Sequence, residues 1–277
     1  MAEDSDFWIR FWGVRGSIAC PGPAHRRWGG HTACVEIGCG DAVFVFDAGT
    51  GVRPLGKRLA SETEGPLDLF LSHTHFDHVV GFPFFAPFYQ RDREVRVWAG
   101  HLAGMQSIYA TVCALMQAPL FPVPPEVFTA DVQFRDFKAG DSIAPRPGFE
   151  LRTAPLNHPN GATAYRIDYH GRSVCYVTDT EHAPDRPDRT ILDLVAGADV
   201  MIYDSSYTDD EFPNYVGWGH STWEEGVRLA DAAGVGRLIP FHHDPIHEDP
   251  QMDAIAEAAE ARRPGTLPAY DGLVLRL

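Results

Sequence analysis

The chain has 277 residues, of which 44% are hydrophobic and 22% are charged, so it can bury a sizeable core. This composition excludes the disordered, collagen-like and coiled-coil classes. The 38 acidic residues outnumber the 23 basic residues and give a net charge of −15. A chain this acidic repels a long polyanion, so a long nucleic acid is not the expected partner.

The first residues, 1–6, are acidic where a secretory signal would be basic, and no apolar run approaches the ~20 residues needed to span a bilayer. We therefore expect a soluble, cytoplasmic protein without a membrane segment. The five cysteines include no C-x-x-C pair, so neither a disulfide framework nor a thiolate zinc site is expected. The thirteen histidines direct attention to imidazole chemistry instead.

Short β-rich runs alternate with helix-like windows along the whole chain, which predicts a single domain over residues 1–277. The predicted strands are 7–12, 32–37, 42–46, 67–71, 95–98, 132–137, 150–154, 163–169, 173–178, 200–203 and 237–241. The predicted helices lie near 51–61, 103–117, 222–234 and 251–262. Helices combined with this many strands favour an α/β architecture of sheets covered by helices over a bare β-sandwich.

The segment 81–90, GFPFFAPFYQ, and the later LFPVPPEVF are rich in proline and phenylalanine. Proline removes hydrogen-bond donors from a strand, so these segments predict packed loops rather than regular structure. They could wall a pocket, form a subunit contact, or make a small core of their own under a long loop.

The strongest motif follows the predicted strand 67–71 directly. SHTHFDH places His73, His75, Asp77 and His78 within six residues, a grouping that is rare by chance. Residues two apart in extended backbone face the same way, so His73 and His75 can share one metal ion. After a turn, Asp77 and His78 can reach a second ion. Because each ion needs roughly four ligands with one position left for water, further ligands must come from elsewhere.

Three other predicted strand ends offer those ligands: His158 in PLNHPNG, Asp179 in YVTDTEH and His242 in LIPFHHDP. A carboxylate has two oxygens, so Asp179 is predicted to bridge the two cations. One ion is then expected to bind His73, His75, His158 and Asp179, and the other Asp77, His78, Asp179 and His242.

Several assignments have competitors in the sequence. His243 could replace its neighbour His242, which is preferred because it aligns better with the end of the strand 237–241. Asp204 competes with Asp179 as the bridge, although the TDTEH context favours Asp179. Asp47, at the end of the strand 42–46, is expected to support the site rather than to bind metal. The nitrogen and oxygen ligands suit two divalent ions, Zn²⁺ first, with Mn²⁺ and Fe as alternatives.

Together these motifs resemble the metallo-β-lactamase-fold hydrolases. The resemblance rests on SHTHFDH followed by His158, Asp179 and His242 in that order, with Asp47 in FVFDAGTG before them. It covers most of the chain and implies an αββα sandwich of two mixed β-sheets flanked by helices, with a dinuclear metal site at one edge. Within the superfamily the chain is most similar to the phosphodiesterase branch, which includes ribonuclease Z and the phosphoribosyl cyclic phosphate phosphodiesterases.

Two further segments support that branch. GWGHST places His220 22 residues before His242 and resembles the His-Ser-Thr segment of ribonuclease Z, whose histidine is implicated in protonating the leaving oxygen. Asp204 in IYDSSY stands where the branch carries an acidic residue that orients this histidine. Only 21 residues separate His158 from Asp179, the interval in which ribonuclease Z carries its tRNA-gripping arm. This short interval and the negative charge favour a small substrate over tRNA.

The sequence therefore predicts a binuclear metal-dependent hydrolase that cleaves a small phosphodiester, such as a cyclic nucleotide or a sugar cyclic phosphate. Two cations would lower the pKa of a bridging water from about 15.7 toward roughly 7, and the hydroxide would attack phosphorus in line. Asp77 would hold the proton of the nucleophile, His220 would protonate the departing oxygen, and Asp204 would orient His220. A hydrolase of lactones, carboxylic esters or thioesters is the main alternative, and a non-catalytic metal-binding or ligand-binding protein is a further one.

Other residues have both a functional and an ordinary interpretation. Arg15 could meet a phosphate, although ion-paired or solvated arginines are more common. Tyr207 and Trp218 flank His220 and could stack on a base, whereas aromatic residues in loops usually serve packing. Glu181 could line the site or belong to a surface loop. The Phe/Pro-rich segments also suggest a self-association surface, so a homodimer is expected.

Overall fold

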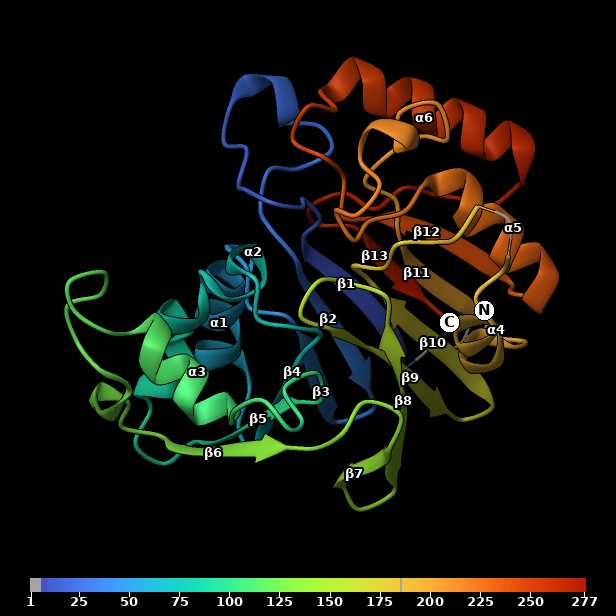
Figure 1. Cartoon of the computed structure of the whole chain (residues 1–277). Helices are drawn as coiled ribbons and strands as arrows, with labels where there is room; N and C mark the ends of the chain where they lie inside the picture. Colours follow the sequence, from blue (N-terminus) through green and yellow to red (C-terminus); the bar gives the residue numbers. More distant parts are fainter. Residues whose placement is uncertain (1–5, 185) are drawn as a thin grey trace.

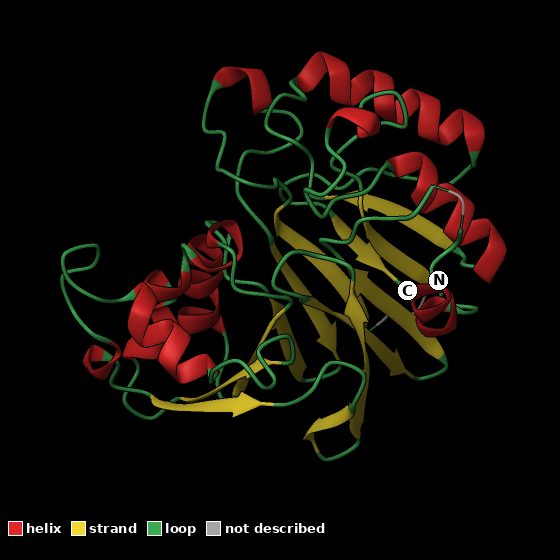
Figure 2. Ribbon diagram, viewed as in Figure 1, coloured by secondary structure: helices red, strands yellow, loops and turns green. Residues whose placement is uncertain are grey.

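The structure is a computed structural model that describes residues 6–184 and 186–277. Two β-sheets pack face to face, and helices cover the outer face of each sheet (Figures 1 and 2). The predicted fold class, an αββα sandwich of two mixed sheets flanked by helices, is confirmed. No helix within the described ranges is both long enough and apolar enough to cross a membrane. The expected homodimer and cytoplasmic location stay predictions.

The first sheet has the strand order β13-β1-β2-β3-β4-β5-β6. Its strands are β1 (Phe7–Gly13), β2 (Cys34–Cys39), β3 (Ala42–Phe46), β4 (Leu67–Leu71), β5 (Glu94–Ala99), β6 (Asp131–Asp136) and β13 (Val274–Arg276). The strands β3 to β6 run parallel to one another, while β1 pairs antiparallel with both β2 and β13.

The second sheet has the strand order β12-β11-β10-β9-β8-β7. Its strands are β7 (Ser142–Arg146), β8 (Phe149–Leu156), β9 (Ala162–Tyr169), β10 (Arg172–Val177), β11 (Val200–Asp204) and β12 (Arg237–Phe241). The strands β10, β11 and β12 are parallel, whereas β7 to β10 are antiparallel. Because β9 and β10 form a hairpin that fills the interval between His158 and Asp179, no arm projects there.

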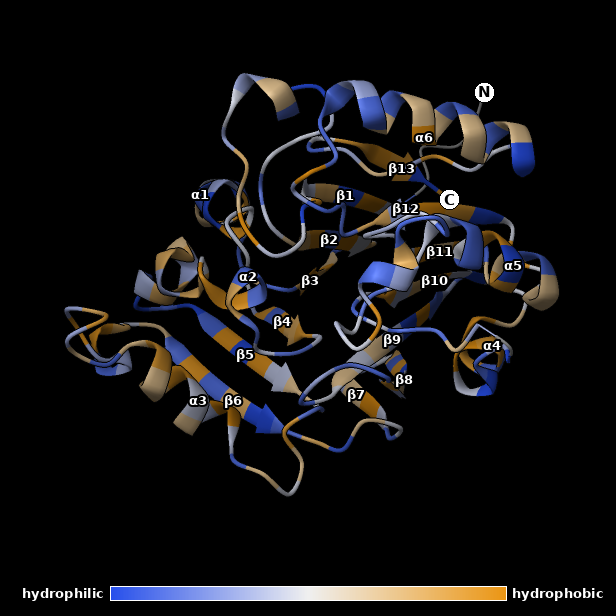
Figure 3. Ribbon diagram, turned by 45° about the horizontal axis from the view of Figure 1, so that its top comes forward, coloured by the Kyte–Doolittle hydropathy of each residue, from blue (hydrophilic) through white to orange (hydrophobic). Residues whose placement is uncertain are grey.

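Helices lie on the outer faces of the sheets, with α1 to α3 on one side and α4 to α6 on the other (Figure 1). They are α1 (Val52–Glu62), α2 (Phe76–Val79), α3 (Ile108–Leu115), α4 (Arg189–Val195), α5 (Trp223–Ala233) and α6 (Asp249–Arg262). Hydrophobic and hydrophilic positions alternate along β5, as Figure 3 shows, because one face of this strand is buried. A strand with this one-sided pattern turns its apolar face toward the interior.

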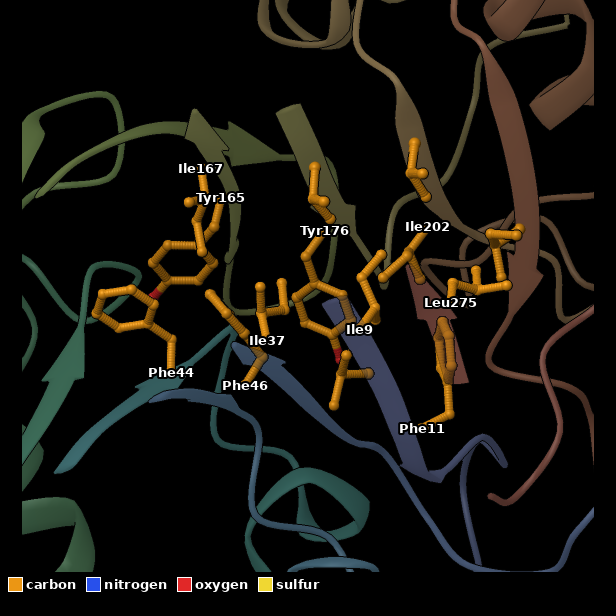
Figure 4. Close-up of a cluster of buried hydrophobic side chains, with 14 of the residues drawn as sticks. Ile9, Phe11, Ile37, Phe44, Phe46, Tyr165, Ile167, Tyr176, Ile202 and Leu275 are labelled. Atoms are coloured by element: carbon orange, nitrogen blue, oxygen red, sulfur yellow. The ribbon is translucent and has the colours of Figure 1, made fainter. Parts of the chain in front are cut away.

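The central core fills the space between the two sheets. Aromatic and branched side chains from both inner faces meet there, and Figure 4 shows Phe46 of β3 near Tyr165 and Tyr176 of the opposite sheet. The ring centroids of Phe46 and Tyr165 lie 5.4 Å apart, and those of Phe46 and Tyr176 lie 5.5 Å apart. This rigid interlayer packing fixes the ends of the strands, where the predicted site residues lie.

The eleven predicted strands all correspond to strands of the structure, but the short elements were not predicted. The edge strand β7 contains a proline, and β13 has three residues, so neither carries a clear alternating pattern. The helices α2 and α4, with four and seven residues, are too short to show helical periodicity.

The Phe/Pro-rich segment 81–90 forms two short 3₁₀ turns, η2 (Phe82–Phe84) and η3 (Ala86–Tyr89). Its side chains Phe82, Phe85 and Phe88 are fully buried and belong to the hydrophobic cluster under α1 and α3. Of the three interpretations of this segment, the structure therefore supports a core beneath a long loop.

Candidate metal centre

Seven side chains that the sequence singles out converge at one edge of the sandwich. Because the carboxyl ends of parallel strands meet at the same edge of a sheet, residues that follow such strands become neighbours. The seven side chains lie after β4 (His73, His75), in α2 (Asp77, His78), after β8 (His158), after β10 (Asp179) and after β12 (His242).

The first group consists of His73, His75 and His158, whose ligand atoms lie within 4.8 Å of one another. Nε2 of His158 is 2.9 Å from Nδ1 of His75. Oδ1 of Asp179 approaches this group at 3.7 Å from His73 Nε2 and 3.9 Å from His158 Nε2. These four residues surround one point with three nitrogens and an oxygen.

The second group consists of Asp77, His78 and His242, whose ligand atoms also lie within 4.8 Å of one another. Nε2 of His242 is 3.1 Å from Nε2 of His78 and 3.2 Å from Oδ2 of Asp77. Oδ2 of Asp179 lies 3.2 Å from His78 Nε2. Oδ1 of Asp179 also lies 3.4 Å from His242 Nε2, so the carboxylate lies between the two groups, where a bridging ligand would be placed.

The hydrogen bonds on the outer side of the rings orient two of the histidines. Nδ1 of His78 donates to Oδ2 of Asp47 at 2.8 Å, and Nδ1 of His158 donates to the carbonyl oxygen of Gly219 at 2.7 Å. With Nδ1 engaged in this way, Nε2 of each ring points to the centre and can bind a cation when it carries no proton.

Serine hydroxyls orient His73 and His242 in the same way. Nδ1 of His73 lies 3.1 Å from Oγ of Ser72, and Nδ1 of His242 lies 3.1 Å from Oγ of Ser206. Each hydroxyl donates its own proton to a carboxylate, so it accepts from the histidine and leaves Nε2 with a lone pair. Among the described residues, Nε2 of His73 is buried and has no hydrogen-bond partner.

Ring nitrogens and carboxylate oxygens that converge at such distances attract a positive charge, which a metal cation can supply. Burial, reinforced by His78, lowers the pKa of His73 well below its usual range, so this ring stays neutral. Burial acts to raise the pKa of Asp179, but His242, His78 and His73 lower it well below its usual range. Burial acts to lower the pKa of His78, but the carboxylates of Asp179, Asp77 and Asp47 raise it well above its usual range, so this part of the centre attracts positive charge. Ionised carboxylates and imidazole nitrogens that converge in this way are a donor set that fits divalent cations.

Asp47 supports the centre from behind His78, as expected from its position. The carboxylate is fully buried and accepts four hydrogen bonds. They come from the backbone N–H of Ser72 at 2.7 Å, its hydroxyl at 2.8 Å, Nδ1 of His78 at 2.8 Å and the hydroxyl of Tyr176 at 2.7 Å. Tyr176, which the sequence did not single out, thus ties the centre to the interlayer core.

Backbone conformations that are rare for residues other than glycine concentrate at the centre. Asp47, Asp179 and His242 have φ angles of 61°, 57° and 64°, each just past the end of a strand. Such conformations cost of order 1–3 kcal/mol each and persist where the surrounding structure enforces them. A Cβ at Gly16 would lie 2.4 Å from the His242 ring, so only glycine fits at that position.

His220 and Asp204 form a pair beside the centre. Nδ1 of His220 donates to Oδ2 of Asp204 at 3.0 Å, and this carboxylate is itself held by the backbone N–H of Thr180 and by Ser206. Burial acts to lower the pKa of His220, but the Asp204 carboxylate raises it to about 9. The His220 ring stacks on that of His242 at a centroid distance of 5.0 Å.

Glu181 also contributes to the site, a role that its sequence context left open. Its Oε2 accepts the backbone N–H groups of Gly217 at 2.7 Å and Gly219 at 2.9 Å. Gly219 then accepts from His158 through its carbonyl oxygen, and a Cβ at Gly219 would lie 2.3 Å from Nδ1 of His158. Glu181 therefore holds the loop 217–219, which contacts His158 and leads into His220.

The structure gives the remaining candidates packing or loop-fixing contacts. Nε2 of His243 donates to Ala269 at 2.8 Å, and burial lowers its pKa to about 3, so His242 alone of the pair joins the cluster. The fully buried side chain of Arg15 donates to the carbonyl oxygens of Gly29 and His247, so it fixes loops. Tyr207 is buried; its ring stacks on that of Tyr215 and meets the His220 ring edge-on at a centroid distance of 6.1 Å.

Residues 43–243 match the sequence model of the β-lactamase superfamily domain. The chain belongs to the β-lactamase superfamily. A relative, ribonuclease Z from Thermoplasma acidophilum, is 24% identical over 98% of this chain and 98% of its own length. The prediction of a metallo-β-lactamase-fold hydrolase is confirmed.

Two solved structures share the fold of this superfamily member over nearly its whole length. The metallo-β-lactamase fold protein YhfI from Bacillus subtilis has a TM-score of 0.70 and 17% identity, and covers 98% of this chain and 99% of its own. A diphosphatase from the PhnP family has a TM-score of 0.70 and 16% identity, and covers 98% of both chains. At these identities the likeness establishes the fold alone.

Proposed function

We propose that this superfamily member hydrolyses a small phosphodiester, such as a cyclic nucleotide or a sugar cyclic phosphate. The observation that carries the proposal is the His220–Asp204 pair, fixed beside the two groups of candidate ligands with a nitrogen-to-oxygen distance of 3.0 Å. An alkoxide that leaves phosphorus is a poor leaving group and benefits from a positioned acid. Relatives named ribonuclease Z and a structural neighbour named a diphosphatase agree with chemistry at phosphorus.

Two divalent cations fit the centre. Zn²⁺ suits the imidazole and carboxylate donors, and Mn²⁺ or Fe would also fit them. When bound, the cations supply Lewis-acid stabilisation of the phosphoryl oxygens and lower the pKa of water. One would be held by His73, His75, His158 and Asp179, and the other by Asp77, His78, Asp179 and His242.

Two residues of the protein then carry out the two proton transfers. Oδ2 of Asp77 is fixed by the backbone N–H of Ser17 at 2.7 Å, and the carboxylate is placed to accept a proton from the attacking water. His220 donates a proton from Nε2 to the departing oxygen, because its Nδ1 is engaged by Asp204. A positioned general acid of this kind contributes roughly 10²–10⁴-fold to the rate.

The fold favours a small substrate over tRNA. The interval between His158 and Asp179 contains the β9–β10 hairpin and no projecting arm. The net charge of −15 disfavours contact with a long polyanion, whereas a small diester can be neutralised by the two cations alone. The same centre could also hydrolyse a lactone, carboxylic ester or thioester. Substrates with different leaving groups therefore distinguish these functions.

The test compares His220→Ala with wild type on two diesters, bis(p-nitrophenyl) phosphate and 2′,3′-cyclic AMP. We expect kcat to fall by about 10²–10⁴-fold on the cyclic nucleotide, whose leaving group is an alkoxide, and much less on the nitrophenyl ester, whose leaving group departs without help. His170→Ala, an exposed histidine in the β9–β10 turn, is the matched control. Equal losses on both substrates, with metal content unchanged, would remove His220 from this role.

A further inference from the structure

A cavity of about 330 Å³ lies beside the candidate metal centre and has no part in the mechanism above. His73 and His75 form its inner wall. The loop 101–106, which follows β5, and the turn at residues 160–161 form the remaining walls. A substrate whose phosphate lies at the centre can therefore extend directly into this cavity.

Two backbone hydrogen bonds stabilise the loop that lines the cavity. The carbonyl oxygen of Leu102 accepts the backbone N–H of Met105 at 2.9 Å and that of Gln106 at 3.3 Å. Gly104, at the tip of the loop, has a φ of 83°, a conformation that glycine adopts without strain. The cavity is thus pre-formed, as binding sites for small molecules usually are.

Three polar side chains around the cavity keep unused hydrogen-bonding capacity. His101 is only 9% exposed, and its Nε2 bonds to Oγ1 of Thr74 at 3.0 Å while its Nδ1 has no partner among the described residues. Gln106 donates through Nε2 to a threonine hydroxyl, which leaves Oε1 as an acceptor. Asn160 accepts from His75 through Oδ1, which leaves its amide N–H groups as donors.

The other side chains determine which kind of group fits. Leu102 and Met105 give the cavity an apolar surface, and Met105 is 59% exposed. The described lining residues include neither lysine nor arginine, so a second phosphate or a carboxylate would find no counter-charge there. A flat, uncharged ring with donors and acceptors along its edge satisfies both the apolar surface and the polar groups, and a nucleobase has these properties.

We propose that this cavity is a nucleobase subsite, in which His101, Gln106 and Asn160 bind the edge of the base and Leu102 and Met105 contact its face. The inference rests on the proposed function, because it assumes that the phosphate of the substrate lies at the metal centre. It narrows the substrate class to nucleoside phosphodiesters, cyclic nucleotides among them, and excludes diesters that carry a second anionic group.

The first experiment measures nucleoside binding to the metal-loaded protein without any turnover. Adenosine, guanosine, cytidine and uridine are titrated by calorimetry, with ribose as the probe that lacks a base. We expect at least one nucleoside to bind at least tenfold more tightly than ribose, and His101→Ala and Gln106→Ala to weaken that binding by about tenfold each. Gln117→Ala, an exposed glutamine that does not line the cavity, is the matched control.

The second experiment measures the ratio of kcat/KM on the cyclic form of the tightest-binding nucleoside to kcat/KM on bis(p-nitrophenyl) phosphate. We expect His101→Ala and Gln106→Ala to lower this ratio about tenfold at unchanged metal content. The subsite is overturned if the protein hydrolyses diesters but binds no nucleoside, or if it binds ribose as tightly as any nucleoside. Either result leaves the proposed function standing. Nucleoside binding without hydrolysis of any diester overturns the proposed function instead.

Discussion

Replacing Asp47 by Asn tests whether the buried carboxylate behind His78 sets the affinity of the metal centre. Asparagine has the same shape and tolerates the φ of 61° at this position, so the substitution changes the chemistry of the side chain without straining the backbone. The carboxylate accepts four hydrogen bonds, from the N–H and hydroxyl of Ser72, from His78 and from Tyr176.

The magnitude follows from these four bonds. With the amide oxygen at the position of Oδ2, the amide NH₂ faces the N–H of Ser72, and a buried donor without a partner costs about 1–3 kcal/mol. The three remaining bonds lose a charged acceptor, which weakens each by about 1 kcal/mol. The free energy of unfolding should therefore fall by about 4–6 kcal/mol. The bond to His78 orients a candidate metal ligand, and its weakening by about 1 kcal/mol should lower zinc affinity by roughly fivefold.

The assay is a competition between the protein and a chelator for Zn²⁺, read at a temperature where circular dichroism shows the variant to be folded. Asp68→Asn is the matched control, because Asp68 is also fully buried and also accepts four hydrogen bonds, from Arg96, Trp98 and Arg146. It lies within β4, and these partners are not candidate ligands. We expect both variants to lose stability and only Asp47→Asn to lose metal affinity. Equal zinc affinities in the two variants would refute the reasoning.

Two further substitutions test other parts of the site. Asp179→Ala removes the carboxylate that approaches both groups of ligands, so elemental analysis should find fewer than two ions per chain; two retained ions would contradict the bridging role. Glu181→Ala leaves two glycine N–H groups without their acceptor, so kcat on a cyclic nucleotide should fall by about tenfold, and Glu181→Gln should restore most of it because the amide oxygen still accepts. A glutamine variant as slow as the alanine variant would rule out this positioning role.

The local patterns of the sequence predicted much of the fold. The strands 42–46, 67–71 and 237–241 were predicted with the bounds that the structure has, since each is a short apolar run with clear ends. The strand β13 and the helix α2 carry too few residues for any periodic pattern, so they were missed. The buried aromatic side chains of η2 and η3 are placed by tertiary packing, which a local pattern does not reveal.

The candidate ligands could be named from the sequence because each follows a strand, and strand ends of a sandwich meet at one edge. The choice between His242 and His243 depended on which ring turns toward Asp77, and only the structure shows this. The partners of the ligands were harder to predict. Tyr176 and Glu181 act through hydrogen bonds to residues far along the chain, and no spacing in the sequence marks such contacts. The metal-binding roles themselves stay predictions.

The most direct test of the central claim is a paired assay on protein whose metal content has been measured. Initial rates are recorded on bis(p-nitrophenyl) phosphate and on 2′,3′- and 3′,5′-cyclic nucleotides, beside a panel of lactones and thioesters. The account predicts hydrolysis of phosphodiesters that disappears with a chelator and returns with Zn²⁺ or Mn²⁺. Hydrolysis confined to the lactones or thioesters, with two metal ions bound, would contradict it.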